Sequence, residues 1–366
     1  MVEAPLLIIA AGGTGGHMFP AQSLAEEMLA RGWRVHLSTD ARGARYSTGF
    51  PEAVKREIVA SASFSRGGVL ARLGAPFRIM TGILTAVAAM RADRPAGVAG
   101  FGGYPALPAI AAAAALKVPC LIHEQNGVLG RVNRIFARRV KKVACGTWPT
   151  NVPDGANAVF TGNPVRQAVL VHAGAPYNPP DGAVIDILVI GGSQGAHLFS
   201  EVVPEALFRM EPDLRGRLRV SQQAREADVE PVRKAYATLG VPADVRTFFD
   251  DVPERMARAQ LVVSRAGASS VADISVLGRP AILVPYAAAT DDHQSANARG
   301  LANAGGAFVI PEAELSAQRL AATMTAILSD PEGAAAMAAA SLTLGRPDAA
   351  KALADLVFEV SGTGQE

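Results

Sequence analysis

The sequence predicts an α/β protein built from two similar domains, each containing a parallel sheet. The chain has 366 residues, more than a single hydrophobic core usually serves, so two domains are expected. It is 49% apolar but only 5% aromatic, and its 36 Gly and 24 Pro provide turns for many short connections. An apolar run, a glycine turn and a helical pattern open the chain at Leu6 and recur from Ile185. This repeat favours two domains of one design facing each other across a cleft.

The opening segment predicts a buried strand, a glycine turn and a helix. The apolar run from Leu6 ends in Gly12-Gly13-Thr14-Gly15-Gly16-His17, and residues 20–30 then have apolar spacing of three and four. Glycines let the backbone pass close to a ligand, and the N–H groups that begin a helix favour an anion such as a diphosphate. A tight turn that binds nothing is the alternative. His17 argues against it, because packing alone rarely needs a titratable side chain beside a permissive backbone.

A second strand over 34–40 ends in Asp40, and a helix is expected over 73–90. An acid about twenty residues after a glycine turn holds the ribose in dinucleotide-binding folds, so a nicotinamide-dependent oxidoreductase or a simple nucleotide-binding module is an alternative function. The glycines do not match G-x-G-x-x-G, because Met18 stands at the third position. One face of the helix carries Leu73, Phe77, Met80 and Ile83, with Arg66, Arg72, Arg78 and Arg91 beside it. That face is either core or a surface that docks on an anionic bilayer.

Further strands in this half end in polar or glycine-rich turns. A strand from Gly97 leads to a glycine turn and Tyr104, a helix follows over 106–116, and a strand from Val118 ends in His123-Glu124-Gln125-Asn126-Gly127. Ligands bind at the carboxyl edge of an open α/β sheet, so these four polar residues predict a site, although one His or Asn alone could be a turn cap. Strands over 141–145 and 158–161 close the half.

The second half starts after a proline-rich boundary at 175–182. A strand from Ile185 leads into Gly191-Gly-Ser193-Gln194-Gly195, and a strand from Leu261 leads into a turn and helix start that contains Gly267, Ser269, Ser270 and Asp273. The hydroxyl and N–H groups there could hold a phosphate. Gln294 and Asn297 lie one helical turn apart, which fits a sugar-binding edge or a solvated turn equally well.

Charge and cysteine content limit the classes of function. Through Asn163 the chain has 18 Lys and Arg against 9 Asp and Glu, and the remainder has 17 against 24, so +9 and −7 give the overall +2. A basic first half implies an anionic partner, and nucleic acid is the least supported because no recognised binding motif appears. Cys120 and Cys145 lie in apolar runs and predict core thiols of a reduced, cytoplasmic protein. No metal-ligand spacing appears, and neither an export signal nor a membrane-spanning segment is expected.

In these motifs the chain resembles the MurG family of bacterial N-acetylglucosaminyltransferases, which convert lipid I to lipid II in cell-wall synthesis. Six motifs match in order over essentially the whole chain: Gly12 to His17, His123 to Gly127, Gly162 to Arg166, Gly191 to Ala196, Ser264 to Gly267 and His293 to Asn297. The resemblance implies a GT-B fold of two Rossmann-like domains. An acceptor- and membrane-binding domain would span 1–163, a UDP-GlcNAc-binding domain 164–340, and a C-terminal helix over 341–366 would cross back to the first.

The resemblance also implies the roles of individual residues. His17 would be catalytic. The acceptor, undecaprenyl-diphosphate-linked MurNAc-pentapeptide at the cytoplasmic membrane face, would contact Thr14, Gly15, Gly16, Tyr104, Glu124 and Asn126. The donor would contact Thr14, Gly15, Gly16, Asn126, Arg166, Ser193, Gln194, Phe249 over the uracil, Gly267, Ala268, Ser269, Ser270, Val271, Asp273, Gln294 and Asn297. Membrane docking would involve Leu73, Phe77, Met80, Ile83, Arg72 and Arg78. No cofactor or metal is implied, and other cell-wall synthesis proteins are expected partners.

Three departures from the family pattern affect the donor contacts. Asp273 stands where Glu is usual, Ser200 where Asn is usual, and Ser221-Gln-Gln-Ala224 where a His-Gln-Thr/Ser-Gly segment is usual. The chemistry is nevertheless consistent with the residues. A sugar hydroxyl that attacks an anomeric carbon needs a base, and the departing diphosphate needs cations or N–H donors. The chain has no Asp-x-Asp, so helix dipoles are expected to replace a metal, and inversion is expected because no carboxylate stands out as a nucleophile. A UDP-GlcNAc epimerase of similar two-domain form is a second alternative.

Overall fold

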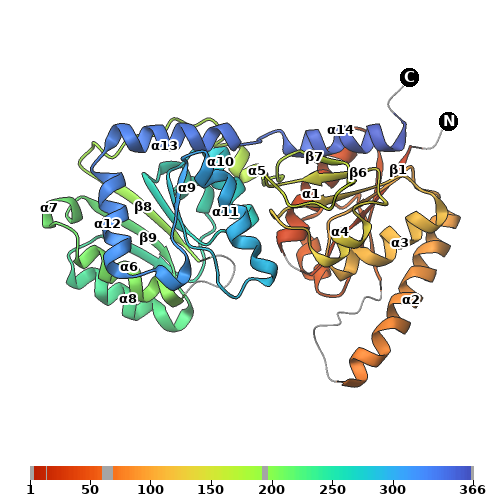
Figure 1. Ribbon diagram of the computed structural model, residues 1–366, viewed down its shortest axis with the longest axis horizontal. Helices are drawn as coiled ribbons and strands as arrows, with labels where there is room; N and C mark the ends of the chain where they lie inside the picture. The colour runs from red at the N-terminus through yellow and green to blue at the C-terminus, as the bar shows by residue number, and fades with distance from the viewer. Residues whose placement is uncertain (1–3, 14, 60–68, 192–196, 364–366) are drawn as a thin grey trace. The chain divides into compact units, whose positions relative to one another are not determined.

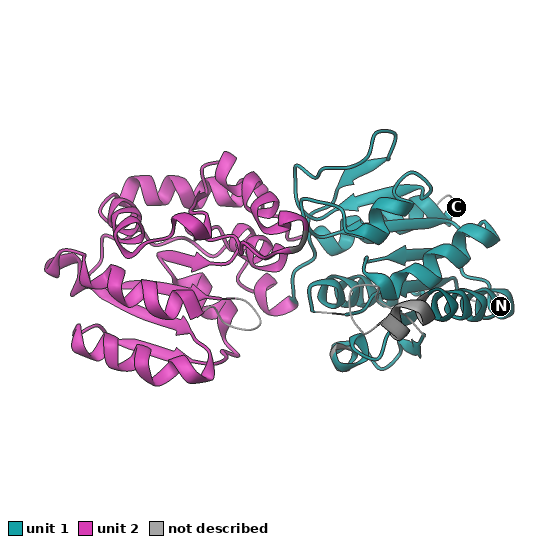
Figure 2. Cartoon of the chain, turned by 60° about the horizontal axis from the view of Figure 1, so that its bottom comes forward, with its two compact units in different colours: residues 1–166, 348–366 teal, residues 167–347 magenta. Residues whose placement is uncertain are grey.

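The computed structural model describes residues 4–13, 15–59, 69–191 and 197–363. It divides into two compact units, coloured separately in Figure 2. Unit 1 comprises Met1–Arg166 and Asp348–Glu366, and unit 2 comprises Gln167–Pro347. The boundaries expected from sequence were 163 and 340. The C-terminal segment thus belongs to the first unit, although the intervening chain forms the second.

Unit 1 is built on a parallel sheet whose order is β3-β2-β1-β4-β5-β6-β7. Figure 1 labels β1, β6 and β7 of this sheet and the helices α1, α2, α3, α4 and α14 around it. Its strands are β1 (Leu6–Ala10), β2 (Arg34–Thr39), β3 (Lys55–Ile58), β4 (Gly97–Gly100), β5 (Cys120–Glu124), β6 (Lys142–Cys145) and β7 (Ala158–Phe160). Its helices are α1 (Gly15–Ala30), α2 (Val69–Ala92), α3 (Leu107–Leu116), α4 (Arg131–Phe136) and α14 (Ala349–Ser361), with short 3-10 turns η1 (Gly43–Gly49) and η2 (Tyr104–Ala106).

Both faces of this sheet are covered, which explains why β1 is apolar at every position. Leu7 and Ile9 pack with side chains of α1 and α14 on one face, whereas Ile8 and Ala10 pack with those of α2, α3 and α4 on the other. Each fully buried Leu or Ile contributes roughly 1.5–3 kcal/mol. A strand buried on both sides therefore needs a continuous apolar run, and the opening run of the sequence supplies one.

Unit 2 repeats the design with the sheet order β10-β9-β8-β11-β12-β13, again parallel. Its strands are β8 (Ile185–Ile190), β9 (Leu218–Gln223), β10 (Ala243–Arg246), β11 (Leu261–Ser264), β12 (Ala281–Leu283) and β13 (Ala307–Val309). Its helices are α5 (Gln167–Leu170), α6 (His197–Phe208), α7 (Pro212–Arg215), α8 (Glu226–Thr238), α9 (Val252–Arg258), α10 (Ala268–Leu277), α11 (His293–Asn303), α12 (Ala317–Leu328) and α13 (Pro331–Leu344), with 3-10 turns η3 (Thr290–Asp292) and η4 (Glu312–Glu314).

The expected α/β class with two parallel sheets is confirmed. In each unit the chain order reverses beside the first strand, between β1 and β4 and between β8 and β11. Ligands of open α/β sheets bind beyond the carboxyl ends of the strands at such a switch point. The loops that follow Ala10, Gly100, Ile190 and Ser264 are therefore where a site belongs.

Candidate functional site

The glycine turn after β1 is held by Asp40. One carboxylate oxygen of Asp40 accepts hydrogen bonds from the backbone N–H of Gly13 (3.1 Å) and of Gly43 (2.8 Å). Gly13 has a φ of +86°, and a Cβ on Gly12 would lie 2.7 Å from both Asp40 Oδ1 and Pro105 Cβ. Only glycine fits at both positions. The position of Asp40 is thus explained by its hydrogen bonds to this turn. Its spacing from the glycines therefore no longer supports a ribose-binding acid of a dinucleotide-binding fold.

His17 lies in the first turn of α1, between the loops that follow β4 and β5. Its Nδ1 is 2.6 Å from the carbonyl oxygen of Phe101 and 2.8 Å from the side-chain amide of Gln125. Its Nε2 faces Gly103, where an added Cβ would lie 3.7 Å away. Three loops at the switch point of unit 1 therefore meet at the imidazole, and the half-buried Tyr104 follows directly after Gly103.

Glu124 organises the loop after β5. Glu124 is 2% exposed. One oxygen accepts from the backbone and side-chain N–H groups of Asn126 (both 3.1 Å), and the other accepts from Gly130 N and Asn133 Nδ2 (both 2.9 Å). These bonds occupy both carboxylate oxygens. Glu124 therefore fixes the position of Asn126, which was predicted to border both substrates.

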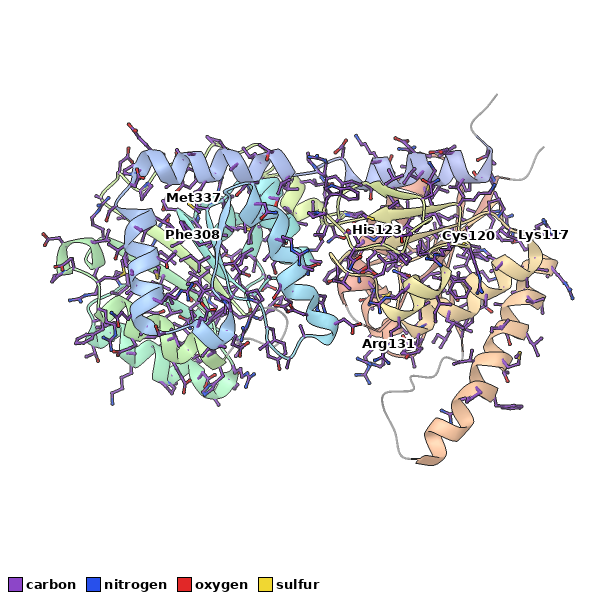
Figure 3. All side chains as sticks on the ribbon, viewed as in Figure 1. Lys117, Cys120, His123, Arg131, Phe308 and Met337 are labelled. Atoms are coloured by element: carbon purple, nitrogen blue, oxygen red, sulfur yellow. The ribbon has the colours of Figure 1, made fainter. Side chains whose placement is uncertain are left out.

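His123 is the buried neighbour of this group, and Figure 3 places it within unit 1. Its ring centroid is 5.2 Å from that of Phe101, and its Nε2 is 3.5 Å from the carbonyl oxygen of Gly162, a long contact. Burial lowers the pKa of His123 to about 4, so the ring is neutral at physiological pH. It packs beneath the site as an uncharged aromatic.

Three further predicted residues of unit 1, Gly15, Gly16 and Arg166, border the same turn. Gly15 and Gly16 form the start of α1, where N–H groups have no partner within the helix. The guanidinium of Arg166 lies 5.5 Å from the centroid of the Phe19 ring, and Phe19 in turn packs against Gly15. A cation and the start of a helix thus lie near the glycine turn, an arrangement that suits an anionic ligand.

In unit 2 the turn after β11 leads into α10. Gly267 is the N-cap residue, and no side chain caps the first turn of the helix. The N–H groups at Ala268, Ser269 and Ser270 therefore point outward, and the side chains of both serines are partly exposed. Val271 is buried against the core. This arrangement can hold a diphosphate.

The remaining predicted residues around α10 differ in exposure. Asn297 is 1% exposed and donates from Nδ2 to the carbonyl oxygen of Ala266 (3.0 Å), so it holds the turn from behind. Gln294 is partly exposed, and its Oε1 accepts from Tyr286 N (2.9 Å). Asp273 is largely buried on α10. Of these three, Gln294 is the most accessible to a sugar.

Phe249, which the resemblance predicts to cover the uracil, is buried in the structure. Phe249 is 3% exposed, and its ring lies under the guanidinium of Arg255, 4.3 Å from the centroid, with Arg246 at 5.6 Å. The preceding Phe248 is 66% exposed. The two aromatic residues are adjacent in the sequence, and only the packing of the folded chain determines which ring is exposed to solvent.

Several predicted positions lie outside the described residues. These are Thr14, Ser193 and Gln194, and in α2 the side chains of Arg72 and Leu73. The described part of α2 decides between the two interpretations of its apolar face. Phe77 is 77% exposed and Met80 is 56% exposed, Ile83 is partly buried, and Arg78 is exposed. At Phe77 and Met80 the face is not core.

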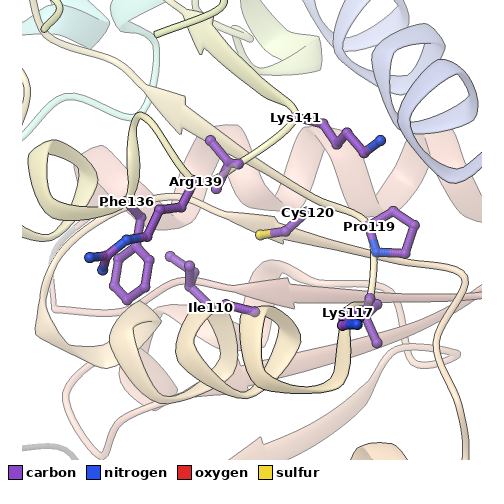
Figure 4. A pocket seen from close by; sticks show the side chains of 10 residues that line it. Ile110, Lys117, Pro119, Cys120, Phe136, Arg139 and Lys141 are labelled. Carbon is purple, nitrogen blue, oxygen red and sulfur yellow. The ribbon is translucent and has the colours of Figure 1, made fainter. Parts of the chain in front are cut away.

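One cavity lies at the opposite edge of the unit 1 sheet, where β5 and β6 begin (Figure 4). It has a volume of about 630 Å³ and an apolar wall that includes Ile110, Cys120 and Phe136. Burial raises the pKa of the Cys120 thiol to about 12, so this thiol is unreactive. Lys117, Arg139 and Lys141 also line the cavity. It is therefore separate from the carboxyl-edge site, and it adds positive charge to the α3 and α4 side of the unit.

Sequence reasoning missed three contributors to the site. Gln125 was recognised as part of a polar segment but given no role of its own, although its amide touches His17. Asn133, which holds Glu124, lies nine residues further along the chain. The carbonyl group of Phe101 belongs to the main chain, so no side-chain pattern could have identified it.

The comparisons with known proteins match the whole chain. The glycosyltransferase family 28 N-terminal domain matches residues 7–145, and the family 28 C-terminal domain matches residues 186–353. A UDP-N-acetylglucosamine–N-acetylmuramyl-(pentapeptide) pyrophosphoryl-undecaprenol N-acetylglucosamine transferase of Rhodospirillum centenum is 50% identical over 370 residues, covering 100% of this chain and 96% of the relative. The protein of the same name from Chelativorans is 49% identical over 361 residues, covering 98% and 96%.

Solved structures agree with this. The crystal structure of Acinetobacter baumannii MurG superposes with a TM-score of 0.80 at 30% identity, covering 97% of this chain and 99% of that one. A putative UDP-N-acetylglucosamine 2-epimerase from Listeria monocytogenes superposes with a TM-score of 0.68 at 14% identity, covering 100% and 98%. The second likeness shows a shared fold alone.

Proposed function

The chain belongs to glycosyltransferase family 28 and, within it, to the MurG-type N-acetylglucosaminyltransferases, and we propose that it converts lipid I to lipid II. It transfers GlcNAc from UDP-GlcNAc to the C4 hydroxyl of MurNAc in undecaprenyl-diphospho-MurNAc-pentapeptide, a step of peptidoglycan synthesis. Near-full-length identity of 49–50% to two such transferases favours this activity over an epimerase. The observation in the structure that carries the proposal is the His17 imidazole at the switch point of unit 1, where Nδ1 contacts the Phe101 carbonyl and Nε2 lies beside Gly103.

In the proposed reaction, His17 Nε2 takes the proton of the C4 hydroxyl as its oxygen attacks the anomeric carbon. The bond between that carbon and the β-phosphate oxygen breaks with inversion, and UDP leaves with the electron pair. The N–H groups at the start of α10 would stabilise the diphosphate, supported by Ser269 and Ser270. Asp273 and Gln294 are proposed as ribose and GlcNAc contacts. Unit 2 is thus proposed to bind the donor and unit 1 the acceptor.

We further propose that the protein works at the cytoplasmic face of the membrane as a peripheral protein. None of the helices in the described ranges is long and apolar enough to cross a bilayer. The exposed Phe77 and Met80 of α2, with Arg78 beside them, provide an apolar and basic surface of the kind that binds an anionic bilayer. A lipid-linked acceptor makes such docking useful. Roles in cell shape and division, and contacts with other cell-wall enzymes, would follow from the activity.

The deciding experiment is transfer of radiolabelled GlcNAc from UDP-GlcNAc to a lipid I analogue by wild type and by His17→Ala. We expect kcat to fall by about 10²–10⁴-fold in the variant, the usual contribution of a general base, while the Kd for UDP is unchanged. His172→Ala, which removes a histidine near Glu254 in unit 2, is the control and should retain full activity. Weakened UDP binding with normal turnover at saturation would contradict the role of His17. UDP release that needs no acceptor would favour an epimerase.

A further inference from the structure

We propose that Gln125 is a positioning residue which, together with the main-chain carbonyl of Phe101, holds His17 in the tautomer that has its proton on Nδ1. The catalytic consequence rests on the proposed function, since it concerns the base of that reaction. The tautomer itself follows from the hydrogen bonds around the ring and is measurable without any substrate.

The Phe101 carbonyl decides which ring nitrogen carries the proton. Its oxygen lies 2.6 Å from Nδ1 of His17, and a carbonyl oxygen can only accept a hydrogen bond. An unprotonated Nδ1 at this distance would place two lone pairs against each other. A proton on Nδ1 converts the same contact into a short hydrogen bond, so Nδ1–H is the favoured form.

The amide of Gln125 completes this arrangement once its orientation is considered. Its nitrogen is placed 2.8 Å from Nδ1, which would bring two donors together, while its Oε1 is buried and has no hydrogen-bond partner among the described residues. Side-chain amide N and O atoms have the same shape and are assigned from their partners. Turning the amide by 180° places Oε1 against Nδ1–H and gives that oxygen its partner. Nδ1–H then lies between two acceptors.

The surroundings hold the amide in place. Gln125 is 4% exposed, and its own carbonyl oxygen accepts a hydrogen bond from Thr147 Oγ1 (2.8 Å). The preceding Glu124 is fixed by the four donors described above. Little side-chain freedom remains at position 125, so its oxygen is already in place before a substrate binds.

This tautomer leaves Nε2 as the hydrogen-bond acceptor of the ring. Nε2 faces Gly103, whose φ of +73° suits glycine. With the proton on Nδ1, Nε2 has a lone pair ready for the C4 hydroxyl proton. When that proton arrives, Nδ1–H becomes part of a positively charged ring, and hydrogen bonds to charged groups are the stronger ones. The two acceptors thus stabilise the ring most when it is protonated.

Titratable and charged groups reach this region from each neighbouring element: Asp40 after β2, Tyr104 on η2, His123 and Glu124 on β5, and Arg166 after β7. Substitutions at position 125 leave these residues in place. A change in the pH dependence of kcat caused by such a substitution therefore reports on His17, the ring that Gln125 contacts.

The kinetic test compares Gln125→Ala with Gln125→Glu. Alanine removes the acceptor, so we expect kcat to fall about 10- to 100-fold while KM for both substrates stays within about 2-fold. Glutamate keeps an oxygen at Nδ1, so kcat should largely recover. Its negative charge also favours the protonated ring, which should move the acidic limb of the pH profile to higher pH by about one unit or more. Gln22→Ala removes another glutamine of unit 1, one that donates to Glu26 on α1 and does not touch the ring, and the acidic limb should stay in place.

The direct test is ¹⁵N NMR of the substrate-free full-length protein labelled at its 6 histidines, with His17→Ala used for assignment. We expect the His17 signal of the neutral ring to show protonated Nδ1 in wild type and a mixture of tautomers in Gln125→Ala. A proton on Nε2 in wild type would overturn the inference, as would equal loss of kcat in both variants with an unmoved pH profile. Protonated Nδ1 in a wild-type protein that transfers no GlcNAc would contradict the proposed function and leave the positioning intact.

Discussion

At the residue scale, buried His123 makes the stability of unit 1 depend on pH. Its pKa is lowered from 6.5 to about 4, mainly by burial. The unfolded chain therefore takes up a proton as pH falls through 6.5, whereas the folded protein does so only near 4. Stability from this group is fully present above about pH 6.5 and is lost as pH falls towards 4, by up to about 3 kcal/mol.

Chemical denaturation of wild type and His123→Phe between pH 7 and 4 measures this contribution. Phenylalanine keeps a ring of similar size and does not titrate, so the variant should lose less stability on acidification. Equal pH dependence in the two proteins would show that the imidazole is not held neutral.

A second residue-scale prediction concerns Glu124. In Glu124→Gln an NH₂ group must face at least two of the N–H donors that the carboxylate now satisfies. The unfolding free energy should fall by about 1–3 kcal/mol, and kcat should fall as well because Asn126 loses its support. Glu359→Gln removes an exposed partner of Lys142 and should cost less than about 1 kcal/mol. Unchanged stability and kcat in Glu124→Gln would mean that the loop is held by other contacts.

At the scale of elements, the predictability of each segment follows from how much of it is buried. β1 and β8 are apolar at almost every position, and both were expected. β3 (Lys55–Ile58) is a largely exposed edge strand, and α4 spans only Arg131–Phe136, so neither shows a clear periodic pattern. Phe249 was predicted as a base contact from the family resemblance, which gives a position but not its exposure. In the structure Arg255 covers the ring of Phe249, whereas Phe248 is 66% exposed.

The buried side chain of Arg279 links helices α9 and α10. Arg279 is 1% exposed and donates to backbone carbonyl oxygens of Met256, Ala257, Leu277 and Gly278, at the carboxyl ends of both helices. Helix carboxyl ends present unpaired carbonyls and a negative dipole, both of which a buried guanidinium satisfies. Burial lowers the pKa of Arg279 because it disfavours the charged guanidinium. The hydrogen bonds to these carbonyl oxygens act in the opposite direction and stabilise the charged form.

Replacing Arg279 by Met should therefore reduce the unfolding free energy of unit 2 by about 3 kcal/mol or more, because several buried carbonyls lose their donors together. Urea denaturation followed by circular dichroism measures it. Arg209→Met removes a surface arginine that pairs with Glu205 four residues earlier, and it should cost less than about 1 kcal/mol. Similar losses in both variants would show that Arg279 contributes no more than a surface charge.

At the scale of the whole molecule, the exposed face of α2 connects sequence, stability and location. A helical stripe of Leu73, Phe77, Met80 and Ile83 is more often core than a membrane contact, but periodicity shows only which residues share a face and not what covers it. The exposure of Phe77 and Met80 excludes core packing for these two side chains. Changing both to Ser should accordingly leave the melting temperature nearly unaltered, whereas core truncations would cost roughly 2–5 kcal/mol each.

Unlike the melting temperature, vesicle binding should change when Phe77 and Met80 are both replaced by Ser. Sedimentation with vesicles containing phosphatidylglycerol is expected to fall for the Phe77→Ser and Met80→Ser double variant, and for wild type at high salt, because basic residues near an anionic surface contribute about 1 kcal/mol each and are screened by ions. Phe208 of unit 2 is a matched control, since it is 61% exposed yet lies on α6, and Phe208→Ser should bind vesicles as wild type does. Activity on a short-chain acceptor in detergent-free solution should survive in all three proteins. If neither the double substitution nor high salt changes vesicle binding, this face is not the docking surface. If the double variant melts at a clearly lower temperature than wild type, the two side chains are covered in the native protein.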